Sequence, residues 1–307
     1  MSGPVSATRK GLERRRRDGG YVTVVVLTFA GLMAALVAAT LNVARPSIGQ
    51  ALVNVDDMQA NALLEAGLAA AGFALFGDKR PAMDVDGLEL PMRTGSVRLR
   101  VESEWGRVDL NGARPELLRG LYEAVGTGAM SPRGFAGLVS DWRDRNSKAD
   151  RNGGEEKDYR NRGLDYRPRN GPFLAIEELM LLPGMTAADY EALAPYLTIN
   201  NPIGMIDPAG APYAVLMAVP EMTENEAGEI KALFSDPEVA RRDLNAAIRR
   251  YRRYLTAGGS EVFRVTVEAR LKNGFAKTAE AVLMAGFRRQ PYFTLSWQVR
   301  DGDAPQT

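Results

Sequence analysis

The sequence contains no cysteine and no histidine. Without thiolates and imidazoles the chain can form no disulfide, no cysteine- or histidine-ligated metal centre and no catalytic triad with an imidazole base. Neighbouring carboxylates do occur, as in Glu155-Glu156 and Glu177-Glu178, but consecutive helical residues point about 100° apart and belong to different surfaces. We therefore expect no enzyme and look for a structural or binding role.

An excess of charge is also lacking, since 39 Lys and Arg stand against 38 Asp and Glu. The positive charge is concentrated at the start, where the first 20 residues include Arg9, Lys10 and the run Arg14 to Arg17. The rest of the chain is slightly acidic. An acidic body is a poor candidate for the field-driven phosphate binding on which nucleic-acid proteins rely.

Residues 21–44 carry no charge. As a helix they would span about 36 Å, slightly more than the hydrocarbon thickness of a bilayer. The basic cluster before them should remain cytoplasmic, so that in a bacterium everything after Arg45 would lie outside the inner membrane.

Three fates of this apolar stretch are open. A secretory signal would be cut after it, near Val37, where small residues follow. It could instead remain as an uncleaved anchor. We favour a third reading, in which cleavage after Gly20 leaves Tyr21 as the first residue of a helix that stays in the membrane, because a helical pattern continues beyond the apolar run.

That pattern covers residues 50–76, where Leu64, Leu68, Ala71 and Leu75 recur at helical spacing, as on a helix half buried against a soluble domain. Pro46 should kink the long helix rather than end it. A basic leader ending in glycine, followed by a helix that is first apolar and then amphipathic, resembles the type IV pilin and pseudopilin family.

In that family the fifth residue of the mature chain is usually a glutamate that helps each subunit dock on its neighbour. Counted from Tyr21, this position is Val25. A carboxylate in a bilayer is costly unless it is paired, so valine suits a subunit with no partner above it. The resemblance is to minor pseudopilin K of type II secretion, which lacks this glutamate.

The remainder of the chain predicts a sheet interrupted by a helical segment. Residues 77–95 are rich in Gly, Pro and Asp and are expected to form a turn, while residues 112–255 read as mostly helical. Period-2 patterns or their continuation predict strands in five segments: 97–102, 104–110, 261–271, 277–287 and 292–299.

Two internal repeats lie in the helical segment. Asp109 and Asp207 each begin a D-x-x-G-A turn that leads into a helix, and Thr186 and Thr223 are expected as helix N-caps. Such hairpins resemble helix-hairpin-helix and SAM-like modules, some of which hold DNA phosphates. We favour packing without a ligand. The counter-argument is an arginine cluster, which at helical spacing is more often a solvated face: Arg241, Arg242, Arg249, Arg250, Arg252 and Arg253.

The protein K family carries the patterns W-x-D-x-D, G-G-x-E-x-x-Y and N-x-P-F-x-x-x-E-E-L. The residues that match them here, with Asn146 replacing an aspartate, are Trp142, Asp144, Asn146, Gly153, Gly154, Glu156, Tyr159, Asn170, Pro172, Phe173, Glu177, Glu178 and Leu179. Together these motifs are specific, and the resemblance runs from the leader to Trp297.

The resemblance implies an α+β fold. A long N-terminal helix, membrane-spanning in its first half, would pack on a small antiparallel pseudopilin sheet, with a large, mostly helical SAM-like domain inserted between strands. The expected segments are a leader (1–20), an anchor (21–44), the first part of the αβ domain (45–110), the inserted domain (111–256), the C-terminal strands (257–300) and a disordered tail (301–307).

The same resemblance implies a structural subunit at the tip of the periplasmic pseudopilus, anchored in the bacterial inner membrane with its N-terminus cytoplasmic. A prepilin peptidase would process it. Its partners would be minor pseudopilins I and J, with H as a further candidate, the inner-membrane platform, and the secretin or secreted cargo. The alternative function is a membrane-tethered, DNA-uptake type protein that uses the hairpins and the arginine cluster on nucleic acid, which salt-sensitive DNA binding would reveal.

Residues 144–158 gather hard oxygen donors on one loop, which suits calcium. An EF-hand counted from Asp144 fails, because Ala149 stands where that loop requires glycine. Protein K relatives bind calcium in this region, so the resemblance implies a different type of site, with candidate ligands Asp144, Asn146, Asp150, Glu155, Glu156 and Asp158. In the alternative, the loop is solvated and its carboxylates are neutralised by Arg143, Arg145, Lys148, Arg151 and Lys157.

Overall fold

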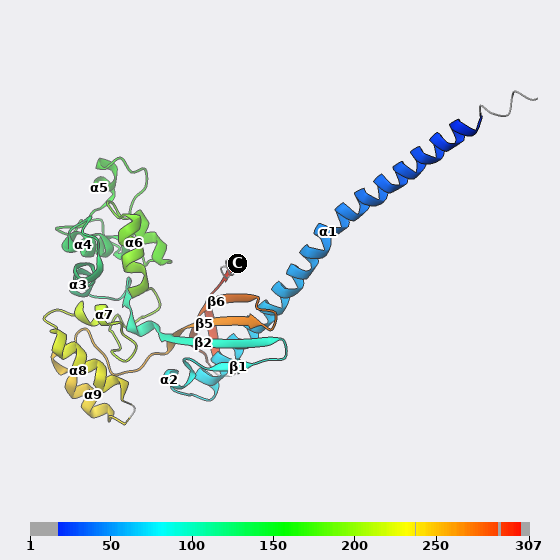
Figure 1. The fold of residues 1–307 in the computed structure, drawn as a ribbon. Coiled ribbons are helices and arrows are strands. Elements are labelled where there is room, and N and C mark those ends of the chain that lie inside the picture. Colours follow the sequence, from blue (N-terminus) through cyan, green and yellow to red (C-terminus); the bar gives the residue numbers. More distant parts are fainter. Residues whose placement is uncertain (1–17, 237, 288–289, 302–307) are drawn as a thin grey trace, which may run out of the picture. The chain divides into compact units, whose positions relative to one another are not determined.

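The computed structural model describes residues 18–236, 238–287 and 290–301 (Figure 1), and for residues 18–22 and 38–54 it describes the backbone alone. Most of the expected leader and all but the first residue of the expected tail therefore lie outside the described residues. The chain divides into two compact units, Met1–Gln59 and Ala60–Thr307.

Helix α1 (Asp18–Gly72) begins close to the expected leader boundary and continues through Pro46. Its stretch Thr23–Val37 is apolar, and these side chains are almost all exposed. This part belongs to the segment predicted from the sequence as a membrane anchor.

The C-terminal part of α1 has a different role. Val55–Gly77 is the segment of the described residues that is long and apolar enough to cross a membrane, but its inner face is buried. Leu64 and Ala71 are fully buried and pack in one cluster with Val97 and Val267 of the sheet. Length and hydropathy alone would mistake this core helix for a membrane span.

The region 77–95, expected to be only a turn, contains two short elements. The single π-turn Phe73–Gly77 (η1) ends α1, helix α2 spans Ala82–Val85, and strand β1 spans Glu89–Pro91. The tight connection from β1 to β2 is closed by a hydrogen bond from Met92 N to Gly95 O, 2.8 Å. The sequence prediction missed β1 because it is short and ends in proline, which an edge strand tolerates.

The sheet is antiparallel, with strand order β1-β2-β5-β6-β7. Strands β2 (Gly95–Ser103), β5 (Val262–Leu271), β6 (Ala276–Ala285) and β7 (Tyr292–Asp301) lie where the alternation predicted them. β2 pairs with β5 over its whole length, from Gly95↔Leu271 to Ser103↔Phe263, so the two halves of the sheet are joined across the helical segment (Figure 1).

The prediction of one continuous strand over 104–110 is wrong. Residues Glu104–Gly106 form a 3-10 turn (η2), and Val108–Asp109 (β3) pairs in parallel with Leu197–Thr198 (β4) in a separate small sheet. The Ser103 hydroxyl accepts a hydrogen bond from Trp105 N at 3.1 Å, which turns the chain out of the first sheet. The apolar alternation persists beyond this point because these residues are buried in the helical segment instead.

The helical segment has a hydrophobic core of its own, separate from that of the sheet. Thr186 and Thr223 cap their helices through hydrogen bonds from Asp189 N and Glu226 N, as expected. The elements are α3 (Pro115–Val125), α4 (Pro132–Arg143), α5 (Glu156–Asn161), η3 (Ile176–Leu181), α6 (Ala187–Leu193), η4 (Ala194–Tyr196), α7 (Tyr213–Met217), α8 (Glu224–Ser235), α9 (Arg241–Ala247) and η5 (Arg249–Tyr251).

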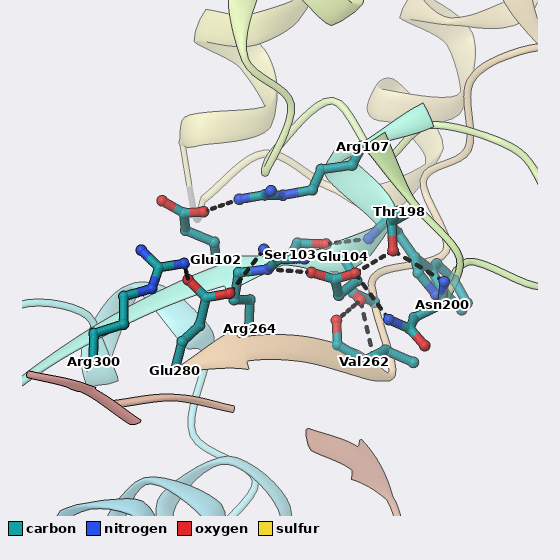
Figure 2. A network of polar contacts seen from close by, with 12 residues as sticks. Glu102, Ser103, Glu104, Arg107, Thr198, Asn200, Val262, Arg264, Glu280 and Arg300 are labelled. Atoms are coloured by element: carbon teal, nitrogen blue, oxygen red, sulfur yellow. Dashed lines mark hydrogen bonds and ion pairs between the residues drawn. The ribbon is translucent and has the colours of Figure 1, made fainter. Parts of the chain in front are cut away.

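A polar network joins the sheet to the helical segment (Figure 2). Glu104 is fully buried, and its Oε1 accepts a hydrogen bond from Arg264 Nε of β5 at 2.7 Å. Its Oε2 accepts from Thr198 Oγ1 of β4 and from Asn200 Nδ2, the latter at 3.4 Å. Arg264 also pairs with Glu280 of β6 at 3.0 Å. One carboxylate thus connects both sheets.

Replacing Arg264 with alanine should destabilise the protein strongly, because it leaves the buried Glu104 carboxylate without its cation. We expect a loss of about 3–5 kcal/mol in the free energy of unfolding, measured by urea titration of the full chain in detergent. The matched control is Arg98→Ala, which removes an exposed 3.5 Å pair with Glu89 and should change stability by about 1 kcal/mol or less. Equal losses in both variants would contradict the structural role of the network.

Candidate metal centre

The loop between α4 and α5 folds around a buried carboxylate. Asp141 of α4 accepts hydrogen bonds from Asp150 N at 3.1 Å and from Gly154 N at 2.8 Å. A Cβ at Gly153 would collide with Asp141 Oδ2, so this position requires glycine. The Gly153-Gly154 motif is therefore explained by the close approach of the loop backbone to Asp141.

Three aromatic motif residues hold the base of the loop. Trp142, Tyr159 and Phe173 are buried together, with the Trp142 ring centroid 5.7 Å from that of Phe173 and 6.5 Å from that of Tyr159. Phe173 is fixed further by two hydrogen bonds with the Asn111 side chain, at 2.7 and 3.0 Å. The motifs that suggested the family in the sequence thus form one packed unit.

The two neighbouring glutamates after Phe173 belong to different surroundings, as expected. Glu178 accepts hydrogen bonds from Trp142 Nε1 at 3.2 Å and from the Arg169 guanidinium, whereas Glu177 is exposed. The pair is not arranged for joint acid–base chemistry.

Most of the predicted metal ligands form local turns. Asp144 accepts from Asn146 N at 3.0 Å and from Asn146 Nδ2 at 2.7 Å, and Asn146 Oδ1 in turn accepts from Lys148 N. Asp150 Oδ1 accepts from Arg151 N, and Asp158 Oδ2 accepts from Glu155 N at 3.0 Å. These side chains belong to one loop, and each already accepts a hydrogen bond from a backbone N–H or a side-chain amide of the same loop.

Glu156 points away from this group. It is half exposed and pairs with Arg160 and, at 3.7 Å, with Arg167. Neither arginine belongs to the five basic residues proposed to neutralise the loop, and among the described residues no ion pair joins those five to the loop carboxylates. Arg143 instead donates to Leu110 O at 2.6 Å and Ala113 O at 2.7 Å.

Glu155 differs from the other candidates because it is 7% exposed and its Oε1 has no hydrogen-bond partner. Asn170 Oδ1 is likewise buried without a donor. Burial raises the pKa of Glu155, the carboxylates of Asp141 and Asp144 raise it further, and a hydrogen bond from the Asn170 side chain only partly offsets these effects. Burial also raises the pKa of Asp141, with Asp144 and Asp150 contributing. Buried acceptors without donors call for a proton or a cation.

Sequence reasoning did not name Asp141 or Asn170 as site residues. Asp141 precedes the loop inside α4, and Asn170, although part of a motif, lies beyond α5. The arrangement is not a ready-made cluster, since within the described ranges no three acidic side chains are placed to hold a metal ion. What the structure offers is two unpartnered oxygens, on Glu155 and Asn170, beside carboxylates that repel one another.

Comparison with known proteins identifies the segment that carries this loop. Residues 103–201 match the family model for protein K of the type II secretion system. Over this segment the chain is similar to the protein K family. The resemblance drawn from the loop motifs is thereby confirmed, and that family is one of pseudopilins rather than enzymes. The leader and Val25 lie outside the matched residues.

The fold is also found in a solved structure, the GspK-GspI-GspJ complex from the enterotoxigenic Escherichia coli type 2 secretion system. One of its chains matches with a TM-score of 0.58 over 83% of this chain and 99% of that chain, at 16% sequence identity. At this identity the likeness shows a common fold. No curated protein matches the sequence.

Other predicted site residues lie in α1. Gly20 and Tyr21 fall in its first turns, where the structure describes the backbone alone, and Val25 is partly exposed in the apolar stretch. Their roles in processing and docking stay predictions.

Replacing Glu155 with glutamine should stabilise the calcium-free protein at neutral pH. Because the pKa of Glu155 is higher in the folded chain than its ordinary value of 4.5, the folded state holds the proton more tightly, and stability falls as pH rises from about 4.5 through the raised value. Glutamine removes this loss. We expect the Tm of the variant, measured in EDTA from pH 4.5 to 8, to exceed that of the wild type by a margin that grows with pH. If the variant were less stable than the wild type at every pH, the conclusion that Glu155 is buried with an unpartnered oxygen would be refuted.

Proposed function

We propose that this chain is a minor pseudopilin that assembles with minor pseudopilins I and J of a type II secretion system and assists protein export. The observation that carries the proposal is the coincidence of two independent comparisons on one chain. The loop region matches the protein K family model, and the larger fold matches a chain from a complex whose title names GspK, GspI and GspJ.

The anchor is supported by the contrast within α1. Between Thr23 and Val37 large apolar side chains such as Leu27, Phe29 and Leu32 are each at least 60% exposed, whereas from Ala60 onwards the same helix buries one face against the sheet. Apolar side chains exposed all round a helix suit lipid. With the arginine run before it, this segment would lie in the inner membrane with its N-terminus cytoplasmic and the sheet and helical segment periplasmic.

Two features support a place at the tip of the pseudopilus. Val25 leaves the chain without the usual glutamate that docks onto a subunit above. The helical segment between β2 and β5 adds bulk that would obstruct a further subunit. From the tip, the helical segment would face the secretin or secreted cargo, while the anchor contacts the platform and H.

Processing by a prepilin peptidase predicts a new N-terminus. We expect Edman or mass-spectrometric sequencing of the full chain, extracted from membranes that contain the peptidase, to begin at Tyr21. Replacing Gly20 with a bulky residue should abolish the cleavage, whereas Gly19→Ala should not. A mature chain that begins at Thr40 or at Met1 would reject processing before the apolar segment.

We further propose that the loop of the protein K segment binds calcium. The unpartnered oxygens of Glu155 and Asn170 would hold the ion together with Asp144, and the cation would supply charge that relieves the repulsion among Asp141, Asp144 and Glu155. Hard oxygen donors of this kind suit calcium. The ion would stabilise the loop rather than take part in catalysis.

Calcium should therefore raise the Tm of the full chain in detergent, by an amount equivalent to about 2.7 kcal/mol at one hundred times the Kd. Glu155→Gln should abolish most of this rise. Glu156→Gln is the matched control, because Glu156 is engaged by Arg160 and Arg167, and it should leave the rise intact. An unchanged Tm at millimolar calcium, or a loss in the Glu156 variant alone, would argue against this site.

The nucleic-acid alternative gains no support from the arginine cluster as a whole. Arg250 pairs with Glu226 at 2.8 Å and with Glu221 at 3.4 Å, and Arg241 donates to Ala257 O and Gly258 O. Arginines that are occupied within the protein cannot form a continuous phosphate-binding stripe.

A further inference from the structure

A second charged feature is a pocket that includes Arg143, the residue just before the loop of 144–158. A cavity of about 510 Å³ is lined by residues 112–115, 143, 203–205, 252 and 253. Its lining contains the four arginines Arg114, Arg143, Arg252 and Arg253 and no acidic residue.

The fold brings these arginines together from three distant parts of the chain. Arg114 is the N-cap residue of α3, Arg143 ends α4, and Arg252 and Arg253 follow η5. Between them the backbones of Gly112 and Gly204 touch so closely that a Cβ on Gly204 would collide with Gly112 O, and Gly204 has φ +63°. Two turns meeting at glycines keep this side of the pocket free of side chains.

The four arginines are not equivalent. Arg143 is held by hydrogen bonds to Leu110 O and Ala113 O, and burial lowers its pKa while Asp109 and Asp144 act in the opposite direction. Arg114, Arg252 and Arg253 are exposed and have no ion pair or hydrogen bond to another described side chain. Of the four guanidiniums that line the pocket, three thus have no side-chain partner and one is held by backbone carbonyls.

Like charges gathered in a pocket repel one another, and an anion that enters relieves this repulsion. The guanidinium fork matches carboxylate and phosphate, but a carboxylate carries one charge and offers one bidentate face. A phosphate group offers several oxygens and up to two charges to guanidiniums on different sides. The internal pairing of Arg241 and Arg250 interrupts the continuous basic surface that the extended backbone of DNA would need.

We propose that the pocket formed by Arg114, Arg143, Arg252 and Arg253 binds the phosphate group of a small anionic ligand. The ligand is either a free phosphate compound or the phosphomonoester headgroup of a lipid.

The test titrates inorganic phosphate, pyrophosphate and glycerol 3-phosphate into the full chain in neutral detergent with EDTA, at ionic strength held constant with NaCl. Calorimetry should show saturable binding to at least one of them. The double variant Arg252→Gln/Arg253→Gln should weaken it about tenfold or more, a loss of about 1.4 kcal/mol or more. Arg114→Gln should act in the same direction. The control is Arg242→Gln, because the Arg242 side chain is 87% exposed and pairs only with Asp243.

A short-chain phosphatidic acid in the same detergent separates the two sources. Tighter binding of this lipid than of glycerol 3-phosphate, lost in the double variant, supports the lipid headgroup, and similar binding of both supports a free phosphate compound. Unfolding curves of each variant without ligand confirm that the fold is intact. The proposal is overturned if none of these compounds binds saturably, if the double variant binds like the wild type, or if a DNA duplex alone binds through these arginines.

Discussion

The pairing of β2 with β5 is the constraint on which the rest of the structure depends. It closes the sheet across the whole helical segment, and closure of so long a loop carries an entropic cost before any contact repays it. The last pair, Ser103↔Phe263, puts the points where the segment leaves and rejoins the sheet side by side. An insertion whose ends lie one strand apart can have its own core without distorting the sheet.

Glu104 lies one residue beyond that last pair and makes this exit specific. Its carboxylate is shared between Arg264 of the sheet and Thr198 of the helical segment (Figure 2). Hydrophobic contacts alone tolerate small rotations between two packed bodies, whereas a buried ion pair with hydrogen bonds on both oxygens favours one arrangement. The sheet and the helical segment, each with its own hydrophobic core, are thus connected through the Glu104 carboxylate.

The sequence predicted those elements whose signal is local. Strands β2, β5, β6 and β7 alternate between apolar and polar residues over much of their length, and the N-caps Thr186 and Thr223 are readable from three or four residues. The prediction of a strand over 104–110 was wrong because alternation does not reveal that the chain leaves the first sheet in a 3-10 turn at Glu104–Gly106. It also does not reveal that β3 pairs with β4. Glu155 and Glu156 are indistinguishable in sequence, and only the fold separates the buried one from the ion-paired one. The arginine pocket joins residues too distant in the chain for any spacing to predict.

The treatment of buried carboxylates elsewhere in the chain shows why the loop stands apart. Asp189 is also buried, but its oxygens accept hydrogen bonds from Tyr122, Thr127 and Thr186 at 2.6 to 2.9 Å. Burial would raise the pKa of Asp189, yet these donors outweigh it and the pKa is lowered. At Glu155 the hydrogen bond from the Asn170 side chain does not outweigh burial and the neighbouring carboxylates, and the pKa is raised. One buried carboxylate is thus satisfied from within the chain, whereas the other has an oxygen without a partner among like charges, and this contrast is the reason for proposing a cation at the loop.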